Sequence, residues 1–187
     1  MTTKIFLIRH GTTSANKENR FAGRTGEALH PEGSRQIKEV GLRMQGERIS
    51  KIFSGPLVRT KESAKIFSDI FSVDYSIDEN FNEIYLPHWD GLTKMEIREK
   101  FGPEYPTWLE SPDKFHVPGC ETLADVQGRA VRSIEKIFAT FPGENILVVS
   151  HLIVIRCLVL HSLKKPIREF RSISIDNGSV TCLSRNT

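Results

Sequence analysis

Two histidines stand directly after short apolar runs rich in strand-forming residues. Residues 5–8 (Ile-Phe-Leu-Ile) precede Arg9 and His10, and residues 146–149 (Ile-Leu-Val-Val) precede Ser-His151. Such runs are typical of buried strands in a parallel sheet, whose carboxyl ends all lie on one edge. We therefore expect the two imidazoles to meet across one crevice. A polar strand end facing solvent is the alternative for either histidine taken alone.

Two further residues complete a set that suits phosphoryl transfer. Arg59 closely follows a third expected strand and should lie in the first turn of a helix at the same edge; the alternative is a solvated side chain. A cation usually prefers the other end of a helix, so this placement indicates an anion site. Glu83 lies in a half-apolar segment that would raise its pKa, as an acid catalyst requires, unless it is a loop carboxylate in water. Guanidinium groups orient phosphate oxygens, and neutral imidazole is a nucleophile.

Strand-like and helix-like segments alternate along the chain. Further elements are expected as strands at residues 51–54 and 73–77, and as helices from Pro31, from Leu57, near 93–101, from Thr122 to Phe141 and over 152–160. Alternation of this kind builds a parallel sheet with helices on both faces. We predict an α/β protein, a three-layer α/β/α sandwich with a mostly parallel central sheet, in a single domain over residues 1–187.

Two segments depart from the alternation. Residues 172–175 and 180–183 flank the turn signal Asp-Asn-Gly-Ser at 176–179, which predicts a C-terminal antiparallel hairpin. Residues 79–121 hold most of the prolines and many aromatic residues, and are predicted to form a small lid insertion. The lid would set substrate choice, unless its aromatic residues are simply its own core.

Composition excludes several classes of protein. The 26 basic and 23 acidic residues give a formal charge of +3, and no basic stripe with interleaved aromatic residues predicts a nucleic-acid site. No apolar segment reaches the ~18 residues of a membrane helix. Three scattered cysteines and a start unlike a signal peptide favour a reducing cytoplasm. No metal-binding motif, P-loop or cysteine-phosphatase motif occurs.

Ordered motifs along nearly the whole chain resemble those of the histidine phosphatase superfamily, the phosphoglycerate-mutase-like proteins. In chain order they are Arg9-His10-Gly11 with Asn16, residues 20–23, Leu29 and Gly33, residues 54–57 with Arg59, Thr60 and Ala64, residues 82–84, residues 89–93 with Glu96 and Ile97, residues 118–122 with Arg129, and residues 149–151 with Arg156.

The resemblance implies a role for each matching residue. His10 would be the nucleophile that becomes phosphohistidine, Arg9 and Arg59 would clamp the phosphate, a protonated His151 would share the charge of the transferring group, and Glu83 would donate a proton. The family's phosphate or substrate contacts fall on four further positions: Asn16, Thr13, Gly23 and the backbone N–H of Leu152. The resemblance implies neither a metal nor another cofactor.

Departures from the family pattern favour hydrolysis. Ala22 lacks a hydroxyl that phosphoglycerate mutases offer their substrate, and residues 89–121 contain no tandem arginine pair for a second phosphate. Leu152 replaces the glycine that usually follows the second histidine, and its bulk narrows the expected pocket. The predicted activity is phosphomonoester hydrolysis of a small phosphorylated metabolite, by a broad-specificity enzyme or one similar to α-ribazole-phosphate phosphatase.

Two other functions stay open at this stage. A cofactor-dependent phosphoglycerate mutase would conserve the phosphate in its product. A non-catalytic module that binds phosphoproteins or has a regulatory role would need Arg9 and Arg59 but neither His10 nor Glu83. We expect a small-molecule partner, with no nucleic acid and no membrane. Lys94 and Lys114 of the lid could meet a further negative charge on it. The oligomeric state is left open, with a homodimer as one option.

Overall fold

A mixed sheet forms the centre of the molecule in the computed structural model, which describes residues 1–186. Its five strands are β1 (Thr2–Arg9), β2 (Ile49–Ser54), β3 (Tyr75–Ile77), β4 (Asn145–Ser150) and β5 (Val180–Asn186), in the order β3-β2-β4-β1-β5. β1 to β4 are parallel, and β5 pairs antiparallel with β1. The carboxyl ends of β1, β2 and β4 therefore share one edge.

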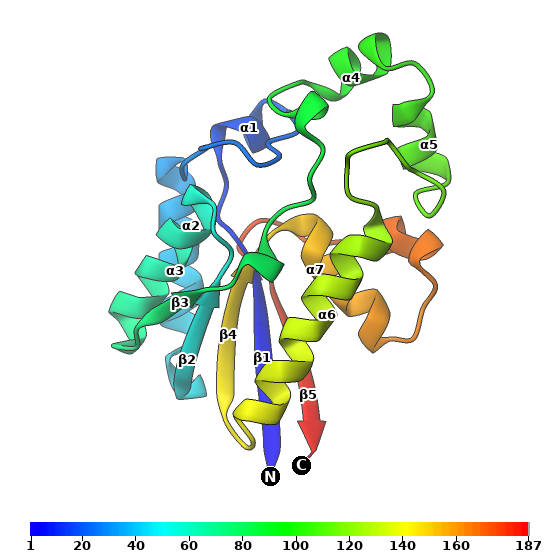
Figure 1. The fold of residues 1–187 in the computed structure, drawn as a ribbon. Helices are drawn as coiled ribbons and strands as arrows, with labels where there is room; N and C mark the ends of the chain where they lie inside the picture. The colour runs from blue at the N-terminus through cyan, green and yellow to red at the C-terminus, as the bar shows by residue number, and fades with distance from the viewer. Residues whose placement is uncertain (187) are drawn as a thin grey trace.

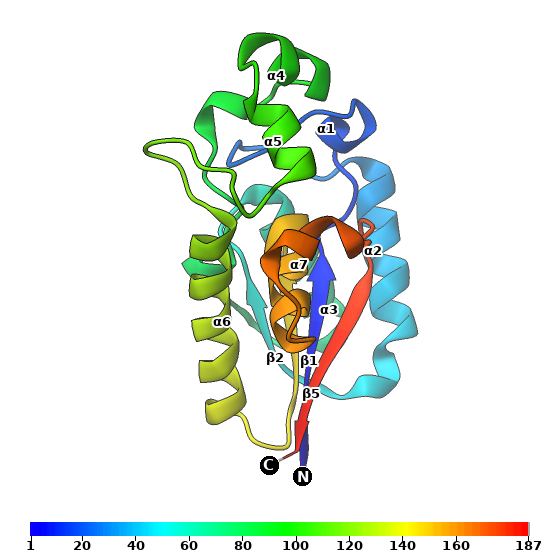
Figure 2. The same ribbon diagram turned by 90° about the vertical axis from the view of Figure 1, so that its right-hand side faces the viewer.

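Helices cover both faces of the sheet, which confirms the predicted three-layer sandwich (Figures 1 and 2). The helices are α1 (Ser14–Lys17), α2 (Pro31–Arg43), α3 (Val58–Phe71), α4 (Lys94–Lys100), α5 (Glu104–Glu110), α6 (Leu123–Thr140) and α7 (Leu152–Ser162), with the short 3₁₀ helices η1 (Gln45–Glu47), η2 (Glu79–Phe81), η3 (Pro87–Trp89) and η4 (Ile167–Ser172). The helices α2 and α3 pack on one face, and α6 and α7 pack on the other.

The alternation of strand side chains divides the core in two. Ile5 and Leu7 of β1 point into the apolar cluster under α6 and α7, whereas Phe6 and Ile8 join the cluster under α2 and α3. Successive side chains of a strand face opposite sides of the sheet, so a strand covered on both faces must be apolar throughout. This explains the uninterrupted apolar runs before the two histidines.

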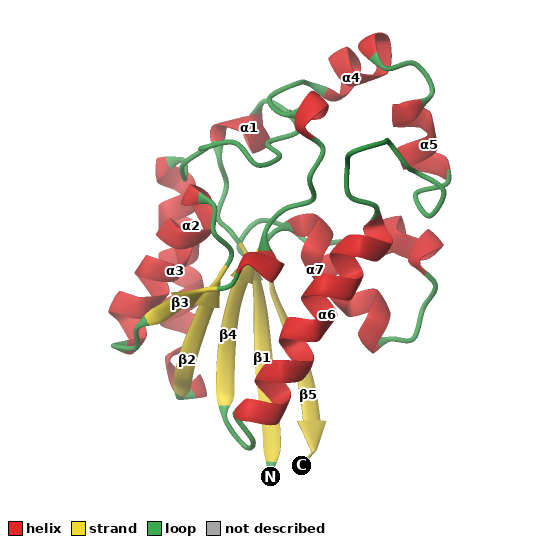
Figure 3. Ribbon diagram, in the orientation of Figure 1, coloured by secondary structure: helices red, strands yellow, loops and turns green. Residues whose placement is uncertain are grey.

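The predicted C-terminal hairpin is wrong in its first half. Residues 173–175 do not form a strand; they follow η4 and lead into a turn before β5, which alone pairs with β1 (Figure 3). Side chains occupy the carbonyl groups that a strand partner would use. Arg156 Nε donates to the Ile173 carbonyl at 2.7 Å, and Arg9 Nη1 donates to the Ile175 carbonyl at 2.8 Å. The turn is present, with Gly178 at φ 70°.

The lid at residues 79–121 rises above the carboxyl edge of the sheet, where α4 and α5 lie over the strand ends (Figure 1). Only one helix, near residues 93–101, was expected here. The second, α5, accommodates Pro103 and Pro106 because both fall at or before its first turn, where no backbone N–H is needed. Trp108 of α5 is buried against Phe170 of η4, their ring centres being 5.5 Å apart. The lid is thereby packed on the body.

Candidate active site

The two histidines meet at the carboxyl edge, as their strand positions predicted. Arg9 of β1 lies opposite Ser150 of β4, and the backbone N–H of His10 donates to the Ser150 carbonyl at 3.1 Å. The rings of His10 and His151 are edge to face, with their centres 5.3 Å apart. Both side chains are buried. Pairing of β1 with β4 thus sets the geometry of the two imidazoles.

Hydrogen bonds decide which nitrogen of His10 carries the proton. Nδ1 lies 2.8 Å from the carbonyl oxygen of Gly11, which can only accept, so the proton belongs on Nδ1. Arg59 Nε donates to Nε2 at 3.3 Å, which requires a bare lone pair there. Burial, followed by the charges of Arg59 and Arg9, holds the pKa of His10 well below its ordinary value. His10 is therefore neutral, with Nε2 available to react.

His151 packs against the His10 ring and is fully buried. Within residues 1–186 neither of its ring nitrogens has a hydrogen-bond partner, and Nδ1 is 4.0 Å from Glu83 Oε2. Burial, with the charge of Arg59 next, lowers the pKa of His151 well below its ordinary value. In the unliganded site this favours the neutral ring over the protonated one that we expected. A neutral imidazole still has one N–H to donate to a bound oxygen.

Two guanidinium groups flank His10, that of Arg59 buried and that of Arg9 half-buried. Arg59, in the first turn of α3 and 1% exposed, donates from Nη2 to the Gly23 carbonyl at 2.6 Å. Arg9 keeps a buried Nε that has no partner within residues 1–186. Burial is the largest cause that lowers the pKa of Arg9, to about 10, and it also lowers the pKa of Arg59. Both stay cationic at neutral pH and suit an anion.

Among the described residues, Glu83 supplies the one carboxyl group of the site. Its side chain is 11% exposed, and burial raises its pKa, although Arg59 opposes this shift. Its backbone is held from outside the site: Arg24 Nε donates to the Glu83 carbonyl at 2.8 Å, and Arg129 Nη2 does so at 3.2 Å. The raised pKa favours a protonated carboxyl that can donate.

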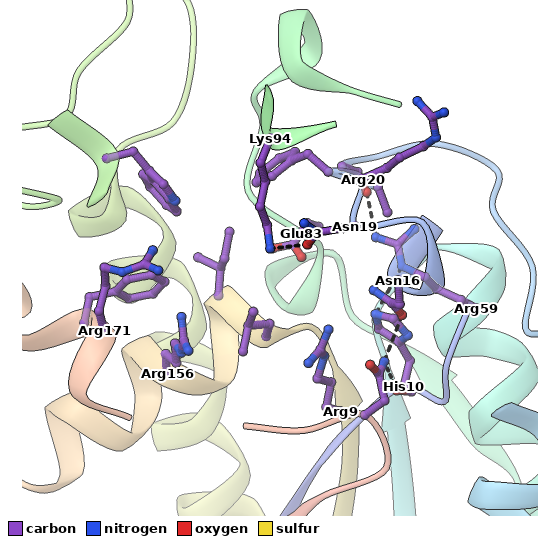
Figure 4. Close-up of a pocket in the computed structure, with 18 of the residues that line it drawn as sticks. Arg9, His10, Asn16, Asn19, Arg20, Arg59, Glu83, Lys94, Arg156 and Arg171 are labelled. Atoms are coloured by element: carbon purple, nitrogen blue, oxygen red, sulfur yellow. Dashed lines mark hydrogen bonds between the residues drawn. The ribbon is translucent and has the colours of Figure 1, made fainter. Parts of the chain in front are cut away.

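A cavity of about 400 Å³ opens above these groups, under the lid (Figure 4). Seven of the predicted site residues line it: Arg9, His10, Asn16, Gly23, Arg59, Glu83 and Leu152. His151 is not among the lining residues, but its ring packs edge to face against that of His10. Thr13 is not part of the wall either. The cavity walls also include Lys94, Tyr105 and Trp108 of the lid, whereas Lys114 is not among the lining residues.

Thr13 acts on the site through a neighbour. Its hydroxyl and backbone N–H both donate to Asn16 Oδ1, at 3.2 and 3.1 Å, in a capping box that starts α1. Asn177 Nδ2 donates to the same oxygen at 3.0 Å and to the His10 carbonyl at 3.0 Å. With its oxygen occupied, Asn16 has its amide NH₂ left for a ligand in the cavity.

Asn177 is a site residue that the sequence reasoning missed. It lies in the Asp-Asn-Gly-Ser turn, which was assigned to a hairpin, and it nevertheless lines the cavity. Arg156 and Arg171 also line it, without a role having been assigned to either. The only available signal was the asparagine in a tight turn, which is common in turns of every function.

Leu152 and Gly23 contribute backbone rather than side-chain chemistry. Leu152 is the first residue of α7, where backbone N–H groups have no helical partner and favour an anion. Gly23 has φ 53°, and a Cβ there would lie 1.6 Å from Asp90 Oδ1. Only glycine therefore allows the Gly23 carbonyl to approach Arg59.

Two absences apply to the part of the chain that the structure describes. Within residues 1–186, no three His, Cys, Asp or Glu side chains are grouped as a metal ion would require. Over the same residues, no helix has both the length and the apolar character needed to cross a membrane.

The fold and cavity define a class of α/β proteins that pair two histidines at the carboxyl edge of a parallel sheet. The chain belongs to the histidine phosphatase superfamily (branch 1), whose family model matches residues 5–187.

The curated relatives include phosphatases and a mutase. Phosphoserine phosphatase 1 of Hydrogenobacter thermophilus is 27% identical over 180 residues, covering 96% of this chain and 85% of the relative. A probable phosphoglycerate mutase GpmB of Salmonella choleraesuis is 26% identical over 182 residues, covering 95% and 83%. The 2-carboxy-D-arabinitol-1-phosphatase of Triticum aestivum is 29% identical over 181 residues, but the chain spans only 36% of it.

A solved structure supports the same assignment. YhfR of Bacillus stearothermophilus superposes with a TM-score of 0.92 at 28% identity, covering 96% of this chain and 90% of that one. The predicted fold class is confirmed by this match.

Proposed function

We propose that the protein hydrolyses phosphomonoesters through a phosphohistidine formed on His10. The observation that carries the proposal is the state of His10: Nδ1–H is bound to Gly11, Nε2 is bare, and Arg59 lies 3.3 Å from it. A neutral nitrogen beside fixed cations suits attack on a phosphate dianion. Membership of a family with phosphatase relatives supports the same reaction.

In the first half-reaction, Nε2 of His10 attacks phosphorus as the bond from phosphorus to the alcohol oxygen breaks. Arg9, Arg59 and the Asn16 amide hold the phosphoryl oxygens, and the N–H of His151 donates to one of them. Glu83 gives its proton to the leaving oxygen, which departs as the neutral alcohol. The cations are already in place, so little reorganisation is needed.

In the second half-reaction, water attacks the phosphorus of phosphohistidine. The carboxylate of Glu83 takes a proton from the water, and the electrons of the N–P bond return to Nε2 of His10. The products are inorganic phosphate and the starting protein, with Glu83 protonated again. The same residue thus serves as acid and then as base.

Phosphoglycerate mutase is the second candidate, because one relative carries that name. Ala22 and the lid without paired arginines favour hydrolysis. A binding module would have no use for the reactive state of His10 or for the buried Glu83.

We assign the protein to the reducing cytoplasm because its three cysteines, Cys120, Cys157 and Cys182, are free thiols.

The proposal is tested by mixing the protein briefly with a phosphomonoester labelled in its phosphate and quenching in base. We expect a base-stable, acid-sensitive label on His10, release of inorganic phosphate, and loss of both in His10→Ala. His161→Ala, which alters an exposed histidine at the end of α7, should retain both. Label on another residue, or turnover that survives His10→Ala, would contradict the mechanism. Label on His10 without release of inorganic phosphate, together with primer-dependent transfer of the phosphoryl group to another hydroxyl, would favour the mutase.

A further inference from the structure

One end of the cavity carries guanidinium groups that the hydrolytic mechanism does not use. Arg156 of α7 and Arg171 of η4 both line the cavity. Figure 4 shows them on the opposite side of the opening from Arg59 and Asn16, with Arg9 between the two groups. An alcohol part that extends across the cavity from the groups proposed to hold the phosphate would reach them (Figure 4).

Arg156 is held in place before any ligand binds. Its Nε donates to the Ile173 carbonyl at 2.7 Å, and its guanidinium carbon lies 5.1 Å from the centre of the Phe170 ring. Phe170 is itself buried against Trp108. Neither Nη atom of Arg156 has a hydrogen bond within residues 1–186. A stacked guanidinium with two unused NH₂ groups is a preorganised anion donor.

The charges at this end of the cavity are not balanced. Neither Arg156 nor Arg171 has a carboxylate partner among the described residues, and Glu83 is the single acid that lines the cavity. Burial, followed by the charge of Arg171, lowers the pKa of Arg156, and Arg171 acts in the same direction on the pKa of Lys94 after burial. The cations therefore repel one another until an anion enters.

One phosphate group cannot neutralise this excess of positive charge. The reacting phosphoryl group is accounted for by Arg9, Arg59 and Asn16. Arg20 also lines the cavity, but Glu18 and Glu96 pair with it. A neutral alcohol would leave Arg156 and Arg171 without a counter-charge.

We propose that Arg156 and Arg171 bind a second anionic group on the alcohol part of the substrate. The inference rests on the proposed function and specifies its substrate class: the phosphate ester of a hydroxy acid, or a bisphosphate. A guanidinium fork pairs with either a carboxylate or a phosphate. An ammonium group at this end of the cavity would meet only cations, so we expect phosphate esters of amino alcohols that lack a second acid group to be poor substrates.

The test compares phosphate release from matched esters of short ω-hydroxy acids of increasing length. Each is paired with the monophosphate of the diol of the same length, the bisphosphate of that diol, and the phosphate of the corresponding amino alcohol. At the length that reaches Arg171, we expect kcat/KM to be about tenfold or more higher for an anionic ester than for the neutral one, as for a charge-assisted hydrogen bond. The amino-alcohol ester should be the slowest. Whether the carboxylate or the bisphosphate is faster identifies the anion.

Substitutions in η4 distinguish anion binding at this subsite from a general effect of positive charge on the protein. Arg171→Ala should reduce the anionic-to-neutral ratio of kcat/KM about tenfold, and Arg171→Glu should shift preference toward the amino-alcohol ester. Arg168→Ala removes an exposed charge from the same 3₁₀ helix, outside the cavity, and should leave the ratio unchanged.

Two failures are distinguishable. Absence of phosphate release from every ester would overturn the proposed function. Release from all esters with no preference for the anionic ones, or equal ratios in Arg171→Ala and Arg168→Ala, would overturn the second-anion subsite alone. Circular dichroism of each variant shows whether it is folded.

Discussion

The two groups that exchange protons and phosphate in the proposed reaction have pKa values shifted in opposite directions. Burial and the neighbouring arginines lower the pKa of His10, whereas burial raises the pKa of Glu83. Burial always disfavours the charged form, which is the acid form of imidazole and the base form of a carboxyl group. One environment therefore favours both reactive forms, neutral His10 and protonated Glu83, at the same pH.

The acid role of Glu83 predicts a selective loss in Glu83→Gln. Hydrolysis of esters with poor alcohol leaving groups should slow about 10²–10⁴-fold, whereas activated aryl phosphates, which leave without a proton, should lose far less. In the native protein kcat/KM should fall as pH rises through the raised pKa of Glu83, and this fall should be absent in the variant. Profiles of kcat/KM against pH with an alkyl and an aryl ester measure both effects.

The control is Glu79→Gln, which changes an exposed carboxyl group of η2. It should leave the preference between alkyl and aryl esters as it is. Equal losses for both kinds of ester in Glu83→Gln would argue against the acid role. So would a kcat/KM that still falls at high pH in this variant.

Residue types and strand ends predicted the histidines and arginines of the site. His10 and His151 directly follow strands, and Arg59 begins a helix after one, so sheet topology alone brings them together. Asn16, Gly23 and Leu152, in contrast, were expected only from the resemblance to the family. Asn177 and Arg171 could not be found in this way, because they reach the cavity through a turn and a 3₁₀ helix. Their positions depend on how the chain returns after α7, which no local pattern specifies.

At the scale of elements, the chain that follows His10 is positioned by close contact between its backbone and that of α2. Gly33 lies in the first turn of α2, and a Cβ on it would be 2.1 Å from the Thr12 carbonyl oxygen. A Cβ on Gly11 would be 2.5 Å from the Gly33 carbonyl oxygen. The start of α2 is thus pressed against the chain that leaves β1, backbone to backbone.

Gly33→Ala should therefore destabilise the protein by about 1–3 kcal/mol, the usual cost of overpacking, because backbone atoms cannot move aside as a flexible side chain can. Gly46→Ala is the matched control, since a Cβ there meets nothing within 4 Å. We expect it to stay within about 0.5 kcal/mol of the native protein. Urea unfolding measures both. Equal stabilities for the two variants would show that the loop after β1 adapts freely.

The expected hairpin shows the limit of element prediction. The turn signal at 176–179 was correct, and β5 does follow it. The preceding segment has the apolar alternation of a strand, but its carbonyls accept from Arg9 and Arg156, which are distant in sequence. A strand pattern reports which side chains are buried; it does not report which donor takes each carbonyl.

At the scale of the whole molecule, Glu121 at the end of the lid joins four parts of the chain. Arg24 Nη2 donates to Glu121 Oε2 at 2.8 Å, Arg129 Nε of α6 donates to Oε1 at 2.8 Å, and the Tyr85 N–H donates to Oε2 at 2.9 Å. The same two arginines also donate to the Glu83 carbonyl. Arg24, between α1 and α2, and Arg129 of α6 therefore position the backbone of the proposed acid, and Glu121 holds both arginines.

Glu121→Gln tests this coupling, since the amide keeps the shape of the side chain but pairs poorly with two arginines. We expect a loss of about 1–3 kcal/mol in stability, because the guanidinium groups are largely buried and lose their counter-charge. The rate with alkyl esters should fall more than the rate with aryl esters, because Glu83 is then less well placed to donate. Glu169→Gln, which breaks the exposed pair with Lys165, should change neither quantity appreciably. Urea unfolding measures the stability, and rates with the alkyl and the aryl ester measure the effect on proton donation. If Glu121→Gln is destabilised but loses both rates equally, Glu121 is a structural residue without influence on proton donation.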